Sequence, residues 1–296
     1  MTADLGQIAA LGTAVCWTVT GLSFEAAGKR IGSLSVNLIR LVMALALLCV
    51  FGAITRGLAF PTDAPPRAWL WLGLSGLIGF SLGDLCLFRA YVTIGSRIAT
   101  LMMALVPPMV ALIGRAFLHE TLTGRDWLAM GITIAGVAWV VLERPTGVGI
   151  SRGHRLQGVL LAFGGAVGQA VGLIMSKRGM GDYNAFASTQ IRIVAGLIGF
   201  IIIYFAIDWW PRAYAALADR GAMWRTLLGA AFGPFMGVSL SLVAVQHTQA
   251  GVAATIMAIV PVLIIAPSAI LFHERVSARA VVGACVAFAG IALLFL

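Results

Sequence analysis

The sequence predicts an all-α membrane protein in which ten transmembrane helices form two inverted five-helix repeats around a central cavity. Composition is the first reason, because 60% of the residues are apolar and only 10% are charged, whereas soluble domains carry roughly 25% charged residues. The second reason is the recurrence of apolar runs that match the ~20 residues of a membrane-spanning helix. The third is a repeat that relates the two halves of the chain.

Apolar runs bounded by charges or turn residues define the ten spans. In chain order we place them at residues 5–27, 35–55, 68–88, 97–118, 126–142, 156–176, 185–207, 223–245, 250–272 and 277–296. The connections between them are short, which leaves no room for a soluble domain. The first span has neither a basic leader nor a small-residue cleavage motif, so we expect it to be retained rather than removed as a signal peptide.

Two nearly equal offsets superpose the halves of the chain. We therefore predict two units, residues 1–145 and 153–296. Because each unit has an odd number of spans, the second must cross the membrane in the opposite sense. A shift of 152 residues aligns segment 12–25 with 164–177 and Arg40 with Arg192. A shift of 154 residues aligns Pro107 with Pro261 and His119-Glu120 with His273-Glu274.

Inverted repeats are typical of transporters, in which a site near the bilayer midplane opens to either side in turn. A channel or a scaffold built by duplication is the alternative. The net charge of +9 is attributed to basic loops that set topology, and no motif supports nucleic-acid binding. We do not expect an enzyme, because the loops contain no nucleophile–base pair, metal set or phosphate loop.

We expect no cofactor and no metal. The four cysteines fall inside predicted spans without the spacing of metal ligands. The two His-Glu pairs lack the second histidine of an H-E-x-x-H zinc motif. The expected partners are the lipid bilayer and a small-molecule substrate.

Residues 89–141, RAYVTIGSRIATLMMALVPPMVALIGRAFLHETLTGRDWLAMGITIAGVAWVV, resemble the EamA-type module of the drug/metabolite transporter (DMT) superfamily. The resemblance is carried by a run of small residues before Pro107, by Glu120 at the end of the fourth span, and by Gly131 and Gly136 in the fifth. The second copy, at 244–295, repeats these marks with Pro261, Glu274, Gly283 and Gly290.

The resemblance implies a ten-helix carrier, and we expect it to act as a monomer in a bacterial inner membrane. Spans one, three, four, six, eight and nine would surround the cavity, and spans five and ten would lie outside it. Bacterial members export amino acids and other metabolites, whereas eukaryotic relatives carry nucleotide sugars and sugar phosphates. We therefore predict export of small metabolites, amino acids first, by alternating access. A nucleotide-sugar or phosphorylated-metabolite carrier, or a drug exporter of the same superfamily, is the alternative.

The first span argues against one mechanism of the superfamily. Small multidrug antiporters use a glutamate in the middle of their first helix, but here that region reads TAVCWTVTG, without an acidic residue. A neutral or zwitterionic substrate therefore fits better than a bulky cation. Facilitated export and proton exchange both stay open.

Pro107 and Pro261 fall near the middle of the fourth and ninth spans. A proline inside a helix removes one backbone hydrogen bond and bends the helix, and neighbouring helices can satisfy the freed carbonyl. We predict that these two prolines are hinges for gating. A static bend that only helps packing is the alternative.

Polar, aromatic and methionine side chains at midspan depth are the predicted substrate contacts. A deep tryptophan offers a flat face and one donor, a buried amide or carboxylate needs a partner, and methionine adapts its shape. Ordinary helix packing is the alternative for each. The residues selected are Trp17, Ser75, Phe80, Asp84, Met103, Gln169, Ser239 and Met257.

Three arginines complete the prediction. Arg40 and Arg192 lie near the starts of spans two and seven, and we interpret them as structural because the repeat assigns them to opposite membrane sides. Asp84 is expected near one membrane edge, where Arg89 follows five residues later. Arg89 is the only basic residue expected in the cavity.

Two criteria disagree on orientation. The loops opposite the termini carry twelve basic residues and the loops on the side of the termini carry five. The positive-inside rule then places the termini outside the cell, whereas the family resemblance implies cytoplasmic termini.

Overall fold

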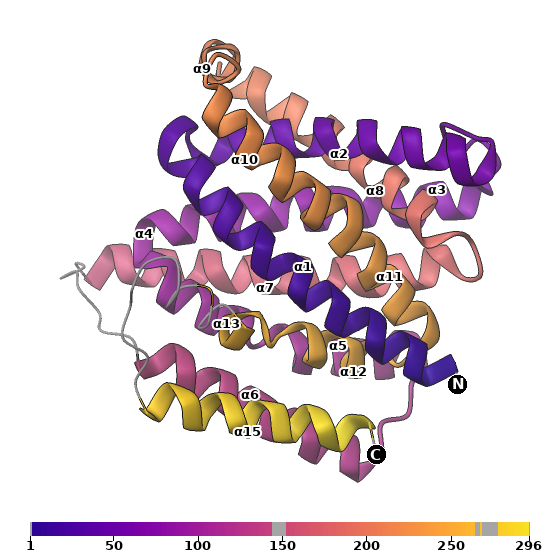
Figure 1. Ribbon diagram of the computed structural model, residues 1–296, viewed down its shortest axis with the longest axis vertical. Coiled ribbons are helices and arrows are strands. Elements are labelled where there is room, and N and C mark those ends of the chain that lie inside the picture. Colours follow the sequence, from indigo (N-terminus) through magenta and orange to yellow (C-terminus); the bar gives the residue numbers. More distant parts are fainter. Residues whose placement is uncertain (1, 144–151, 264–266, 268–277, 296) are drawn as a thin grey trace.

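The computed structural model describes residues 2–143, 152–263, 267 and 278–295, and the regular structure in these ranges is helical throughout. The helices form a bundle with both chain ends at the lower right of Figure 1. The predicted features at His273 and Glu274 lie outside the described residues.

Seven segments make up the described part of the first half. They are α1 (Thr2–Ile31), α2 (Ser33–Arg56), α3 (Pro66–Gly76), the π-helix η1 (Leu77–Gly83), α4 (Asp84–Met103), α5 (Val106–Phe117) and α6 (Gly124–Glu143). Glycine separates two of these helices, because Gly32 between α1 and α2 has a φ of 81°, a conformation that costs glycine little.

The second half repeats this order with two differences: the short helix α9 is added, and two helices, α11 and α12, stand in place of α4. Its described segments are α7 (Arg152–Met180), α8 (Ala185–Ala206), α9 (Trp210–Ala216), α10 (Arg220–Ala230), the π-helix η2 (Ala231–Gly237), α11 (Val238–His247), α12 (Ala250–Met257), α13 (Val260–Leu263) and α15 (Ala278–Phe295).

The ten predicted spans are found in part. Among the described residues, six helices are long and apolar enough to cross a membrane, and two shorter apolar helices accompany them. The six are Asp4–Ile31, Ser33–Arg56, Pro66–Leu87, Leu156–Met180, Ala185–Ala206 and Arg220–His247, and the shorter two are Val106–Phe117 and Val281–Leu294.

The boundary between spans three and four lies later in the chain than we predicted. We expected a connection at 89–96, but α4 is helical from Asp84 to Met103, and the break comes at Ala104 and Leu105. The predicted connection contains no proline, so nothing in its backbone chemistry forbids a helix. Leu87 and Ile94 of α4 also pack on α7, where they meet Gly165 and Gly158.

Matched helices of the two halves run antiparallel to each other. In the α2–α8 pair, Tyr204 Oη donates to Leu34 O at 2.8 Å, while Gln190 Nε2 contacts Cys49 Sγ at 3.1 Å near the opposite end. In the α6–α15 pair, Arg125 contacts Leu293 O at 3.1 Å, and a Cβ at Gly136 would lie 2.4 Å from Ala287 N. Antiparallel matched helices are the arrangement that two inverted units require.

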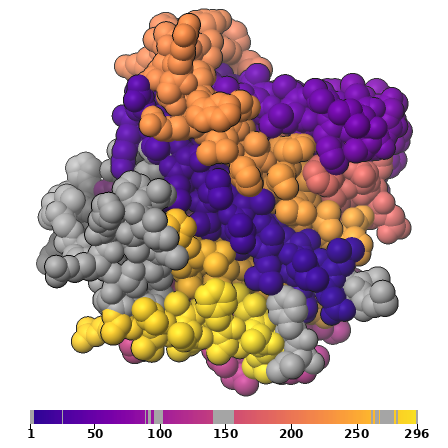
Figure 2. Space-filling view, in the orientation of Figure 1, coloured from indigo at the N-terminus to yellow at the C-terminus, as the bar shows by residue number. Residues whose placement is uncertain are grey.

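Each half also packs its first helix into the other half. The helix α1 contacts α10, η2 and α11, and its counterpart α7 contacts α3, η1 and α4. Figure 2 shows α1 in indigo, flanked by the orange and yellow segments of the second half. Glycines permit these contacts, since a Cβ at Gly168 of α7 would lie 2.9 Å from Gly83 Cα. Small residues at helix crossings allow such close approach within a membrane.

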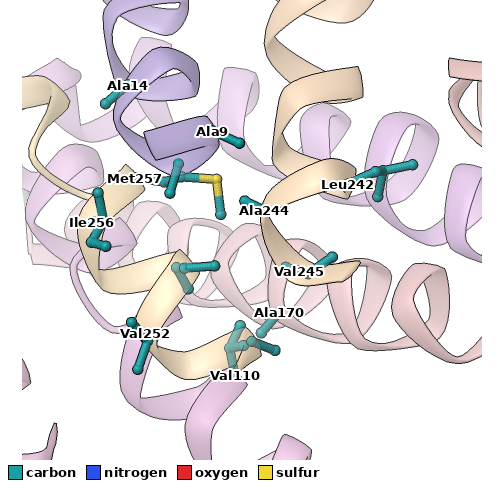
Figure 3. Packing of buried hydrophobic residues seen from close by; sticks show 14 of the residues in the cluster. Ala9, Ala14, Val110, Ala170, Leu242, Ala244, Val245, Val252, Ile256 and Met257 are labelled. Carbon is teal, nitrogen blue, oxygen red and sulfur yellow. The ribbon is translucent and has the colours of Figure 1, made fainter. Parts of the chain in front are cut away.

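The end of the bundle that carries the termini is filled by small apolar side chains. Ala9 and Ala14 of α1, Ala244 of α11, and Ile256 and Met257 of α12 belong to one buried cluster (Figure 3). Helices α5 and α7 contribute to the same cluster. This packing joins elements of both halves into one core.

Candidate functional site

Charged side chains from both halves meet in the interior of the bundle. Arg40 of α2 forms an ion pair with Asp84 at the start of α4, through its Nη2 and the Asp84 Oδ2. Arg192 of α8 lies within electrostatic range of the same carboxylate. Only 9% of Arg40, 6% of Asp84 and 5% of Arg192 is exposed. Burying charges in this way is costly unless they are paired or serve a function.

The position of these arginines corrects our prediction. We expected Arg40 and Arg192 on opposite membrane sides and Asp84 near Arg89, but both buried arginines converge on Asp84 and Arg89 is exposed. The error arose because the repeat places matched residues in equivalent helices without showing how those helices pair. Antiparallel packing of α2 and α8 brings both arginines toward one carboxylate.

Gln169 of α7 completes the contacts of Asp84. Its Nε2 donates to the Asp84 Oδ1 at 3.0 Å and lies 3.5 Å from Gly79 O. Both carboxylate oxygens of Asp84 are therefore engaged, one by Arg40 and the other by Gln169. This contact joins two predicted site residues, one from each half.

Arg192 is held differently. Its guanidinium lies over the ring of Phe80, with Cζ 4.9 Å from the ring centroid, a cation–π distance. Its Nε is buried without a hydrogen-bond partner. Within the described part of the chain, the guanidinium makes no hydrogen bond and no ion pair shorter than 4.0 Å.

The π-helix η1 positions Phe80 and Asp84. A π-helix has a wider turn than an α-helix and often marks a functional site. Tight packing fixes η1 against α8, because a Cβ at Gly76 would lie 2.1 Å from Arg192 O and a Cβ at Gly196 would lie 2.9 Å from Phe80 Cβ. The second π-helix, η2, occupies the matched position 154 residues later.

The other predicted contacts serve packing between helices in this structure. Ser75 Oγ donates to Gly172 O at 2.7 Å, and Ser239 Oγ donates to Thr189 Oγ1 at 3.2 Å. Met257 belongs to the core cluster at the end with the termini, and Met103 packs in a smaller cluster between α4 and α7. The structure therefore brings Phe80, Asp84 and Gln169 together and distributes these four elsewhere.

Trp17 lies against η2. A Cβ at Gly237 would stand 2.8 Å from Trp17 Nε1 and 2.8 Å from its Cδ1, so the indole packs directly on the glycine backbone. The side chain is only partly buried. Its repeat mate is Gln169, which is also partly buried, so these two matched positions of α1 and α7 are alike in burial although their residues differ.

The two predicted hinge prolines begin helices instead of bending them. Helix α4 ends at Met103 and α5 starts at Val106, so Pro107 lies in its first turn. Helix α12 ends at Met257 and α13 begins at Val260, immediately before Pro261. Proline is tolerated in a first turn because its missing N–H would have no partner there. Both interruptions occur at the same repeat position.

A second charged group ties the halves together at the end with the termini. Lys177 Nζ lies 2.6 Å from Glu120 Oε1 and donates to Thr248 O at 2.6 Å. Glu120 Oε2 accepts from the backbone N–H of Ala250 at 2.9 Å. Nothing in the sequence selects Lys177 as the partner of Glu120.

A surface hollow of about 440 Å³ lies beside this group and is lined by Gln7, Glu120, Lys177, His247 and Val252, among others. It does not include Arg40, Asp84 or Arg192. We place the candidate site at the buried charges because the repeat and the burial of ionisable groups both point there, whereas the hollow is a shallow depression at one end.

Comparison with known proteins gives a family match over nearly the whole chain and relatives that match part of it. The model of the EamA-like transporter family matches residues 4–142 and again 156–296. An uncharacterized transporter from the cobO 3' region of Sinorhizobium sp. is 34% identical over 133 residues, which cover 44% of this chain and 92% of that protein.

Two further similarities extend the comparison. The threonine/homoserine exporter RhtA of Escherichia coli K12 is 32% identical over 139 residues, which span 44% of this chain and 43% of the exporter. The match therefore covers less than half of either protein. A protein known from a crystal structure superposes on 98% of this chain and 96% of its own, with a TM-score of 0.76 at 16% identity, which indicates a shared fold.

Proposed function

The chain belongs to the EamA-like transporter family, and from this membership we propose that it exports small metabolites, amino acids first, by alternating access through the site around Asp84. The observation that carries the proposal is the meeting of ionisable side chains from both halves in an apolar bundle. Intramembrane charges that face the interior are typical of substrate pathways.

The arrangement of the halves supports alternating access. Matched helices are antiparallel, and inverted units can exchange conformations around a fixed central site. In this structure the end with the termini is closed by an alanine-rich core and by the Glu120–Lys177 pair. We propose that a monomer in a bacterial inner membrane opens this end when the opposite end closes.

Amino acids are the first choice of substrate. The similarity to a threonine/homoserine exporter supports this choice, and the buried set of one carboxylate, one amide and two guanidinium groups is able to bind both ends of a zwitterion. The test is release of labelled amino acids from liposomes that contain the purified protein. No release of any of the twenty amino acids would remove this substrate class.

The two buried arginines also support a second candidate, a carrier of phosphorylated metabolites. Arginine binds phosphate well through its fork of donors. Loading the same liposomes with a labelled sugar phosphate separates the two candidates. Release of the sugar phosphate without release of any amino acid would replace the first candidate by the second.

A further inference from the structure

We infer that Arg192 binds a carboxylate group of the transported molecule, so that the substrate must carry one. This inference rests on the proposed function, because it assigns the chemistry of the same central site. It goes further by naming the binding residue and the chemical group that it selects.

The first step is the unmet hydrogen-bonding need of Arg192. Only 5% of Arg192 is exposed, and its buried Nε lacks an acceptor. Within the described residues its guanidinium forms no ion pair. A guanidinium stays charged at every physiological pH. Burying it without an acceptor is unfavourable, and a bound anion would remove that cost.

The second step excludes Asp84 as the missing partner. The Asp84 Oδ2 is engaged by Arg40 and its Oδ1 by Gln169, 3.0 Å away. Arg192 therefore feels the charge of Asp84 without sharing a hydrogen bond with it. The donors of Arg192 remain open for a ligand.

The third step selects a carboxylate over other anions. The planar fork of a guanidinium matches the two oxygens of a carboxylate. Phe80 covers one face of the Arg192 guanidinium at 4.9 Å, so a ligand must approach at the edge, where those donors lie. The nearby Asp84 carboxylate disfavours a doubly charged phosphate more than a singly charged carboxylate.

The experiment compares L-threonine with L-threoninol, which has a hydroxymethyl group in place of the carboxylate. We measure efflux of each labelled compound from proteoliposomes. The unaltered protein should release threonine at least about tenfold faster than threoninol, since a lost charge-assisted hydrogen bond changes rates by about ten- to a hundredfold. Equal release of the two compounds would overturn the carboxylate assignment and leave the export function standing.

Three variants locate the effect. Arg192→Gln should reduce threonine efflux at least about tenfold. The efflux rate of Arg192→Lys should lie between those of the unaltered protein and Arg192→Gln, because lysine keeps the charge but loses the planar fork of donors. Arg212→Gln is the matched control, since Arg212 also lies over an aromatic ring, that of Trp209 at 4.1 Å, but is exposed in α9. Unchanged threonine efflux in Arg192→Gln would overturn the inference.

A binding measurement separates failure of the inference from failure of the proposed function. Isothermal titration of the detergent-purified protein with propionate should show binding that Arg192→Lys weakens, even if no amino acid is exported. Absence of propionate binding, or tighter binding of phosphate or chloride at the same site, would overturn the inference. If Arg192→Gln does not elute as a folded species, the Arg192→Lys result decides.

Discussion

At the level of single residues, glycine decides where helices of the two halves can touch. A Cβ at Gly136 of α6 would lie 2.4 Å from Ala287 N and 2.8 Å from Gly283 O of α15. Gly131 of the same helix has no neighbour within 4 Å of such a Cβ. The two glycines are alike in the sequence, and only the packing distinguishes them.

This difference predicts opposite effects of the same substitution. Gly136→Ala should lower the stability by about 1–3 kcal/mol, because α15 must move away from the added methyl group. Gly131→Ala should be neutral or stabilising by up to about 1 kcal/mol, since alanine favours the helix. Thermal unfolding of both variants in one detergent measures the effect. Equal destabilisation of the two would contradict this account of the α6–α15 contact.

At the level of helices, the fourth and ninth predicted spans are interrupted at matched positions. The breaks at Ala104–Leu105 and Ala258–Ile259 each precede a helix with proline in its first turn. Discontinuous helices near the midplane are a recurrent device of transporters. The prolines keep the two pieces separate, because neither can donate the hydrogen bond that a continuous helix needs there.

Replacing one proline should therefore affect motion more than binding. In Pro107→Ala the restored N–H can reach Met103 O, so one of the two backbone hydrogen bonds missing at this break can form, while Pro108 still lacks the other. We expect transport turnover to fall several-fold while substrate affinity changes little, as measured by efflux rates and calorimetric titration. Pro211→Ala is the control, because Pro211 also lies in a first turn, that of α9. Unchanged turnover in Pro107→Ala and Pro261→Ala would exclude the hinge.

A helix cap on the side opposite the termini gives a pH prediction. Asp219 caps α10 by accepting from Ala222 N at 3.0 Å, and Arg30 donates to its carboxylate at 2.7 and 3.0 Å. The Arg30 hydrogen bonds and the cap hold the pKa of Asp219 below its ordinary value of 3.8. A group with a lowered folded pKa stabilises the protein above its unfolded pKa and loses this contribution as the pH falls through the folded value.

Because the pKa of Asp219 is lowered in the folded protein, its contribution to stability should persist until the pH becomes strongly acidic. The melting temperature of the unaltered protein should exceed that of Asp219→Asn by a constant amount from pH 7 to pH 5. The difference should shrink only below about pH 4, where the carboxylate becomes protonated. A difference that already disappears between pH 7 and pH 5 would show that this pair is not its source.

At the level of the whole molecule, the halves are joined by reciprocal packing and by ionic contacts, which include the Arg30–Asp219 pair and, among the described residues near the termini, the Glu120–Lys177 group. Glu120 comes from the first half, and Lys177, Thr248 and Ala250 come from the second. An opening of this end must separate these groups. The pair is therefore a candidate latch of the state seen here.

Removing the latch should expose the core beside it. In a background without native cysteines, a thiol at Ala253→Cys, which is buried in α12, should react several-fold faster with a methanethiosulfonate reagent when Lys177→Met is added. Arg178→Met is the control, because the neighbouring Arg178 is exposed, donates to Phe117 O at 3.0 Å and lies over the ring of Trp71, without joining the Glu120 group. Equal acceleration by both variants would argue against the latch.

Much of the architecture could be predicted because it depends on local composition and on repetition. The apolar runs predicted an integral membrane protein, and the marks around Pro107 and Pro261 predicted the family, which the family match confirms. The predicted number of membrane-spanning helices is confirmed only in part. The break after span three lies elsewhere than predicted, and its position depends on how α4 packs on α7. Of the candidate site, Asp84 and Gln169 were predicted from the cost of burying polar groups in lipid.

The sequence by itself determined that the protein lies in a lipid bilayer, which family it belongs to and that its two halves repeat each other, because hydropathy and spacing are properties of the chain alone. Only the tertiary structure decided which repeated residues meet. Arg40 and Arg192 were assigned to opposite sides, yet both approach Asp84, and Lys177 was unmarked, yet it pairs with Glu120. These contacts join different helices, most of them across the two halves, so they depend on the antiparallel pairing of helices, which no local pattern encodes.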